Sequence, residues 1–124
     1  MGKRILILDD DQDILDIISD LLIDCGFEVQ TLSTGEQIFS VISQFHPDLV
    51  LMDVMLANMD GRVICRNLKE NENTQFIPVI LISGTHDLAH SLNQIGAPND
   101  FIPKPFDIDF LLNKIKYQLL QPHF

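Results

Sequence analysis

The sequence predicts an α/β fold in which five strand–helix units form a three-layer (βα)5 sandwich around one parallel sheet. Three short apolar runs, at residues 5–8, 49–52 and 77–82, are typical of strands that are buried on both faces. Two weaker strand patterns, at residues 27–32 and 101–102, are typical of sheet edges. Because parallel strands are joined by right-handed crossovers, this assignment favours the spatial order 2-1-3-4-5, with the strands counted along the chain.

The first strand is expected at residues 5–8, and the first helix begins near Asp11. The inward stripe of this helix repeats at three- and four-residue spacing and comprises Ile14, Leu15, Ile18, Leu21 and Leu22. Gly26 ends the helix, because glycine readily takes the left-handed conformation that follows a helix. Residues 27–32 alternate apolar and polar side chains, which indicates a strand with one face in water.

A capping box, Ser33-x-x-Glu36, predicts the start of the second helix. The apolar face of this helix comprises Ile38, Val41, Ile42 and Phe45, and His46-Pro47 ends it. The third strand runs into Asp53 and a loop with the turn residues Asn58, Asp60 and Gly61. A third helix then carries Val63, Ile64 and Leu68.

The fourth strand is expected at residues 77–82, and Ser83-Gly84-Thr85 opens a fourth helix. The apolar residues of this helix are Leu88, Leu92 and Ile95, and Gly96 and Pro98 end it. Pro103 and Pro105 flank the short last strand and favour an edge position. Asp107 caps the final helix, whose apolar residues include Phe110, Leu111, Ile115 and Leu119.

The composition predicts one domain, spanning residues 1–124, with no output domain after the last helix. The chain has 124 residues, and 46% of them are hydrophobic, which is enough for a core. No apolar run reaches the roughly 18 residues of a membrane span. Cys25 and Cys65 form neither a metal-binding spacing nor a disulfide framework. We therefore expect a cytoplasmic protein with no membrane partner.

The charge is strongly negative and unevenly distributed. A formal net charge of −10 argues against direct binding to nucleic acid. No Lys or Arg lies between Arg4 and Arg62, whereas twelve acidic residues do. They are Asp9, Asp10, Asp11, Asp13, Asp16, Asp20, Asp24, Glu28, Glu36, Asp48, Asp53 and Asp60. A cation is the expected partner of this half of the molecule.

Acidic side chains directly follow the first and third strands, which are predicted neighbours. Asp9, Asp10 and Asp53 therefore converge at the carboxyl edge of the sheet, where open α/β sheets bind ligands. Carboxylates this close raise each other's pKa unless a cation neutralises them. A ligand set of oxygens, without His or Cys, favours Mg²⁺ over zinc.

The fourth and fifth strands bring a hydroxyl, from Ser83, and a mobile ammonium, from Lys104, to the same edge. This combination predicts phosphoryl transfer, with Asp53 as the nucleophile that forms an aspartyl phosphate. Mg²⁺ and Lys104 would neutralise the transferring oxygens, and Ser83 would donate a hydrogen bond to one of them.

Asp9-Asp10, Asp53, Ser83 and Lys104-Pro105, in this order and spacing across the whole chain, resemble the receiver domain of bacterial two-component response regulators. The resemblance implies a flavodoxin-like fold, of which this family is a standard example with the same strand order. It implies that Asp53 takes a phosphoryl group from the histidine of a partner kinase or phosphotransfer protein. It also implies that the protein is no enzyme in the usual sense, since it catalyses only its own phosphorylation and dephosphorylation.

The resemblance further implies a ligand set for the metal. Mg²⁺ would be held through Asp10, Asp53 and the carbonyl group of Met55, with Asp9 in the outer shell.

The resemblance also implies a switch. Ser83 would move toward the phosphoryl group, and Phe101 would swing inward as the coupled aromatic. The Lys104–Pro105 peptide bond would be cis. The signal would reach an unknown downstream protein through the fourth helix, fifth strand and fifth helix.

Two residues depart from the family pattern. Ala57 stands where the family usually has proline, and Gly84 stands where it usually has alanine. Both changes bear on loop mobility and phosphoryl lifetime, and neither removes a reacting group. Two alternatives stay open: a degenerate receiver that binds proteins without being phosphorylated, and an aspartyl-phosphate phosphohydrolase.

Four acidic residues form one stripe on the first helix, since they lie three, four and four positions apart: Asp13, Asp16, Asp20 and Asp24. One interpretation is a solvated helix face. The other is a surface that selects a phosphodonor with basic residues beside its histidine.

Overall fold

The computed structural model of the protein describes residues 2–56, 59–84 and 97–121. Five parallel strands form its central sheet: β1 (Arg4–Leu8), β2 (Glu28–Leu32), β3 (Leu49–Asp53), β6 (Val79–Ser83) and β7 (Asp100–Pro103). The strands lie side by side in the order β2-β1-β3-β6-β7. This is the predicted order 2-1-3-4-5, so the flavodoxin-like topology is confirmed.

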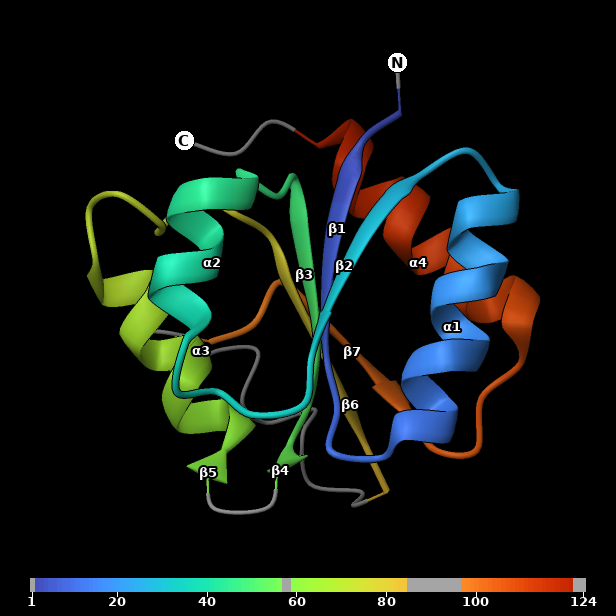
Figure 1. Ribbon diagram of the computed structural model, residues 1–124, viewed down its shortest axis with the longest axis horizontal. Helices are drawn as coiled ribbons and strands as arrows, with labels where there is room; N and C mark the ends of the chain where they lie inside the picture. Colours follow the sequence, from blue (N-terminus) through green and yellow to red (C-terminus); the bar gives the residue numbers. More distant parts are fainter. Residues whose placement is uncertain (1, 57–58, 85–96, 122–124) are drawn as a thin grey trace.

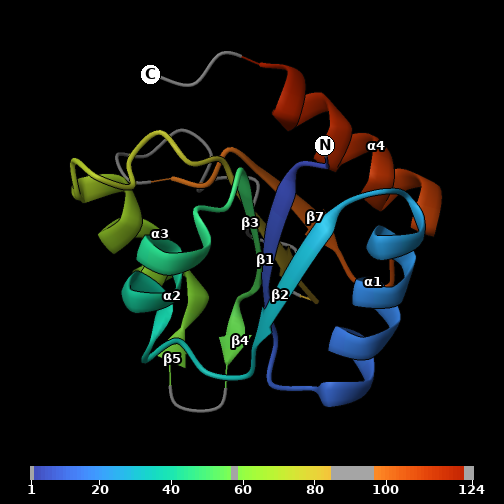
Figure 2. The ribbon, with the colours of Figure 1, turned by 45° about the horizontal axis from the view of Figure 1, so that its top comes forward.

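Helices cover both faces of the sheet, which gives three layers (Figures 1 and 2). On one face lie α1 (Gln12–Asp24) and α4 (Ile108–Leu120), and on the other lie α2 (Ile38–Phe45) and α3 (Gly61–Glu70). Each helical layer has its own apolar core against the sheet. The predicted fourth helix falls on residues that include 85–96, which lie outside the described part of the chain.

The burial of the strands follows the apolar patterns of the sequence. Every residue of β3 and β6 is buried, as is β1 from Ile5 onward. In contrast, β2 has no buried residue and β7 has one, Ile102. The prediction that the alternating and proline-limited strands occupy the edges is therefore confirmed.

Capping side chains start the two helices of the α1/α4 layer. The Asp11 carboxylate accepts hydrogen bonds from the backbone N–H groups of Asp13 and Ile14. The Asp107 carboxylate accepts one from Asp109 N at 2.8 Å, as predicted. Such caps satisfy N–H groups that the first turn of a helix leaves free. Gly26, just beyond α1, has the predicted positive φ, at 95°.

The predicted capping box at Ser33 and Glu36 is wrong. The helix begins only at Ile38, after an N-cap residue, Gln37, whose side chain makes no capping hydrogen bond. The physical reason is the packing of the preceding loop. In this loop the backbone at Gly35 approaches the side chain of Ile64 in α3, where an added Cβ atom would clash with Ile64 Cδ1, and a local capping pattern does not include such a tertiary contact.

A small antiparallel hairpin follows β3 and was not predicted. It pairs β4 (Met55–Leu56) with β5 (Met59–Asp60) and leads directly into α3. The sequence pattern marked this stretch only as a loop with turn residues.

No helix in the described ranges is both long and apolar enough to cross a lipid bilayer.

Candidate functional site

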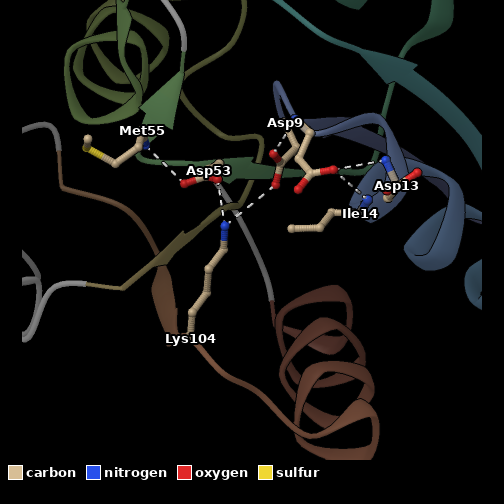
Figure 3. A network of polar contacts seen from close by, with 7 residues as sticks. Asp9, Asp13, Ile14, Asp53, Met55 and Lys104 are labelled. Carbon is tan, nitrogen blue, oxygen red and sulfur yellow. Dashed lines mark hydrogen bonds and ion pairs between the residues drawn. The ribbon is translucent and has the colours of Figure 1, made fainter.

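The candidate site lies at the carboxyl edge of the sheet, where β1, β3 and β7 deliver charged side chains. Asp53 is the last residue of β3, Asp9 follows β1, and Lys104 follows β7. The side chains converge although 51 residues separate Asp53 from Lys104 in sequence (Figure 3). The parallel order of the strands produces this, since it places β1 beside β3 and all their carboxyl ends at one edge.

An ion pair joins the two central groups. Lys104 Nζ lies 2.7 Å from Asp53 Oδ2 and 3.9 Å from Asp9 Oδ2. The other oxygen of Asp53, Oδ1, accepts a hydrogen bond from the backbone N–H of Met55 at 3.0 Å (Figure 3). Each oxygen of the Asp53 carboxylate therefore accepts a hydrogen bond from the protein, and the two donors are different residues.

Asp9 is a buried carboxylate with one unsatisfied oxygen. The residue is 2% exposed, and its Oδ1 accepts a hydrogen bond from Asp11 N at 2.9 Å. Oδ2 is buried and accepts no hydrogen bond from the part of the chain that the structure describes. Burial raises the pKa of Asp9 from 3.8 to about 6, and the nearby Asp53 carboxylate adds to the effect, against the opposing influence of the Asp11 N–H and Lys104.

For the pKa of Lys104, neighbouring charges outweigh burial. Partial burial by itself would lower the pKa of this ammonium group. The hydrogen bond to Asp53 and the charges of Asp53, Asp9 and Asp10 outweigh the burial, so the pKa of Lys104 is raised. The lysine therefore stays cationic at neutral pH and is a fixed positive charge in an acidic pocket.

The arrangement fits a hard divalent cation. Asp9, Asp10 and Asp53 each offer a carboxylate oxygen, and these atoms lie within 4.8 Å of one another. Oxygen donors of this kind, with Asp10 open to water, suit Mg²⁺, which usually keeps several waters and takes one or two carboxylates. The unsatisfied Oδ2 of Asp9 is a further indication, since a buried carboxylate oxygen normally has a partner.

The remaining predicted site residues are positioned around this centre. Ser83 is the last residue of β6, is fully buried, and accepts a hydrogen bond at its carbonyl from Lys104 N at 2.8 Å. The Lys104–Pro105 peptide bond is cis. Phe101 is half-buried and packs against the core beneath α2 and α3. Ala57 lies outside the described residues.

Sequence reasoning missed a close backbone contact behind the candidate acceptor. The N-terminus of α3 packs against the end of β3 so tightly that a Cβ atom at Gly61 would clash with the carbonyl oxygen of Asp53. Asp60 caps the same helix, accepting a hydrogen bond from Arg62 N at 2.8 Å. The only sequence signal was the Asp60-Gly61 pair, which reads equally well as an ordinary turn. Gly84 is the other departure from the family pattern, and apart from its chain neighbours no described residue has an atom within 4 Å of the position of a Cβ atom there.

Comparisons with known proteins agree on the family. Residues 5–116 match the profile of the family described as the response regulator receiver domain. The transcriptional regulator RpaA of Synechocystis, named as DNA-binding, is 32% identical over 114 residues, which cover 91% of this chain and 47% of RpaA. A CheY-like receiver domain protein from Methanospirillum hungatei has a structure with a TM-score of 0.85 at 31% identity, over 96% of this chain and 94% of that one. A response regulator structure from Chloroflexus aurantiacus gives a TM-score of 0.88 at 25% identity, over 98% and 100% of the two chains.

The chain belongs to the response regulator receiver domain family. The predicted resemblance is therefore confirmed. The chain spans about half the length of the first curated relatives that it matches, including RpaA. The prediction that the chain makes no direct contact with nucleic acid gains no support from these relatives, since RpaA is itself named as DNA-binding.

Proposed function

We propose that this protein is a phosphorylation-controlled signalling switch in a two-component phosphorelay and that Asp53 is its phosphoacceptor. The observation that carries the proposal is the 2.7 Å ion pair between Lys104 and Asp53 at an edge that also holds Asp9 and Asp10. A structural aspartate at a strand end needs neither a lysine from a distant strand nor two further acids beside it.

In the proposed reaction, an Asp53 carboxylate oxygen attacks the phosphorus of a phosphohistidine on a partner kinase or phosphotransfer protein. The new P–O bond forms as the P–N bond breaks, and the imidazole of the partner leaves with the bonding electron pair. The Met55 N–H and the Lys104 ammonium hold the carboxylate in place before attack. Lys104 then stabilises negative charge on the transferring oxygens, and the Ser83 hydroxyl donates a hydrogen bond to one of them.

Asp10, Asp53 and the Met55 carbonyl would hold Mg²⁺, with Asp9 in the outer shell. When bound, the ion supplies neutralisation of charge on the phosphoryl oxygens. Dephosphorylation by water at the same site would complete the cycle, so the protein would catalyse only its own modification. The output would pass through the segment at residues 85–96, β7 and α4, by a bias of Ser83 and Phe101 between two positions.

Incubation of the protein with acetyl phosphate and Mg²⁺, followed by intact mass spectrometry, tests this function. A single phosphoryl adduct that is absent in Asp53→Asn and present in the exposed-surface control Asp20→Asn supports the switch. The absence of any adduct favours an unphosphorylated binding module. Sustained release of phosphate over many turnovers favours a phosphohydrolase.

The partner surface that we propose lies on α1. Asp13, Asp16, Asp20 and Asp24 are all exposed on this helix. Beside them, an apolar hollow of about 180 Å³ lies between α1 and α4, and Ile17 and Ile108 on its two sides are 63% and 48% exposed. Apolar contact area with a charged rim is typical of a protein interface. The phosphodonor is thus expected to present basic residues around an apolar contact.

Charge reversal separates this partner surface from the chemistry. Asp16→Lys with Asp20→Lys is expected to slow phosphotransfer from the phosphodonor while acetyl phosphate remains equally effective. Glu70→Lys with Glu72→Lys is the matched control, since it makes the same change of net charge on exposed residues at the far end of α3. Equal phosphotransfer rates for the two double variants would contradict the role of α1.

A further inference from the structure

A groove of about 500 Å³ lies on the side of the molecule away from Asp53. It runs between the end of α2 and the segment that joins α3 to β6. These segments lead into the amino ends of β3 and β6, whereas Asp53 and Ser83 lie at the carboxyl ends of the same strands. Figure 1 shows the end of α2 and this joining segment at the opposite edge from the β4/β5 hairpin. The groove is therefore separate from the candidate phosphoacceptor site.

Two exposed aromatic rings and two isoleucines line the groove. Phe39 of α2 and Phe76 of the joining segment are 41% and 44% exposed, and Ile42 and Ile77 come from the same two segments. Exposed rings that gather around a hollow differ from scattered apolar surface residues, which need no explanation. Both rings are therefore accessible to a ligand in the groove.

Among the described residues that line the groove there is no Lys, Arg, Asp or Glu, although the chain has a formal net charge of −10. The polar groups of this lining are neutral donors and acceptors. Of these, the side chains of Ser43, His46 and Asn73 form no hydrogen bond with any part of the chain that the structure describes. The groove thus combines aromatic walls with uncharged polar groups that remain available, which is the usual composition of a small-molecule site.

The backbone at His46 is in an unfavourable conformation. Its φ is 53° and its ψ is 61°, in the left-handed region, and the next residue is Pro47. Residues other than glycine rarely adopt this region, and a following proline further restricts the backbone. Glycine would end α2 here with less strain. The His46 imidazole is thus held at the groove in a backbone position where the end of a helix by itself would favour glycine.

We propose that this groove binds an uncharged aromatic compound that carries a hydrogen-bonding substituent. The ring of the compound packs on Phe39 and Phe76, and its substituent bonds with His46, Ser43 or Asn73. An anionic ligand is disfavoured because the protein is strongly acidic and because no Lys or Arg is among the described residues that line the groove. The volume suits a compound of one or two rings.

Titrations observed by NMR, with phenol and indole as probes, test the proposal on the unphosphorylated protein. Saturable shifts are expected for the Ile42 and Ile77 methyl groups, with weaker binding of cyclohexanol, which lacks the aromatic face, and of benzoate, which is anionic. Binding of cyclohexanol as tight as that of phenol, or shifts that do not saturate, would overturn the proposal.

Three variants test whether the compound binds in the groove. Phe76→Ala is expected to weaken phenol binding by about 2- to 10-fold, the usual worth of one aromatic contact. Phe110→Ala removes a ring of matched exposure, 42%, from α4 and should leave binding unchanged. His46→Gly should weaken binding by a similar factor to Phe76→Ala, roughly that of one hydrogen bond, while the urea midpoint stays level or rises. Unchanged binding in both groove variants would overturn the assignment, and none of these results depends on phosphorylation of Asp53.

Discussion

Replacement of Asp9 by asparagine should stabilise the metal-free protein at neutral pH. Asp9 is 2% exposed, and burial raises its pKa from 3.8 to about 6. The folded state therefore holds this proton at pH values where the unfolded state has released it. Stability consequently falls as pH rises from about 4 to about 6, and the loss persists above that range. A shift of about 2 pKa units corresponds to roughly 3 kcal/mol, an upper value because Asp9 interacts with Asp53 and Lys104.

Urea denaturation in EDTA between pH 4.5 and 7.5 measures this effect. The free energy of unfolding of the wild type should fall relative to Asp9→Asn as pH rises through this window, and the variant should be more stable by up to about 3 kcal/mol at pH 7. Asp20→Asn, an exposed acid on α1, should follow the wild-type curve. If the free energies of unfolding of wild type and Asp9→Asn changed in parallel with pH, the reasoning that burial raises the pKa of Asp9 in the metal-free fold would be refuted.

Three further predictions follow from the same geometry. Lys104→Met should lower the rate of Asp53 phosphorylation by acetyl phosphate by about 10- to 100-fold, because the positive charge 2.7 Å from the Asp53 carboxylate is lost. A phosphorylation rate equal to that of the wild type would contradict the proposed role of Lys104. Gly61→Ala should destabilise the protein by about 1–3 kcal/mol in urea, because the new methyl group meets the Asp53 carbonyl. Gly84→Ala should change stability by less than about 1 kcal/mol, because its Cβ atom would meet no described residue beyond its chain neighbours within 4 Å; equal effects would contradict the packing argument. Asp107→Ala should lower the free energy of unfolding by about 1 kcal/mol, because α4 loses its N-cap. An unchanged thermal midpoint would contradict a stabilising role of this cap.

The sheet was predictable because burial leaves a direct trace in the sequence. The first four residues of β3 and of β6 are apolar without interruption, since both faces of each strand are covered. The meeting of the charged side chains at one place was predictable from the topology, because the carboxyl ends of parallel strands lie at the same edge of the sheet. The Asp9, Asp10 and Asp53 cluster, with Lys104 beside it, therefore needed only the strand order.

What the sequence did not predict depends on contacts between segments that are distant along the chain. The expected capping box at Ser33 does not form, and the loop in its place packs Gly35 against Ile64, a contact that no local pattern encodes. The β4/β5 hairpin is only two residues long on each side, too short for strand periodicity. The tight approach of Gly61 to Asp53 is likewise invisible until β3 and α3 are placed together.

Borohydride reduction of the acetyl phosphate-treated protein tests the central claim most directly, because an aspartyl phosphate is reduced to homoserine while a free carboxylate is not. Peptide mass spectrometry should then find homoserine at position 53 and nowhere else. Homoserine at position 9 or 10 would contradict Asp53 as the acceptor. So would the absence of homoserine from a sample that carried the phosphoryl mass before reduction.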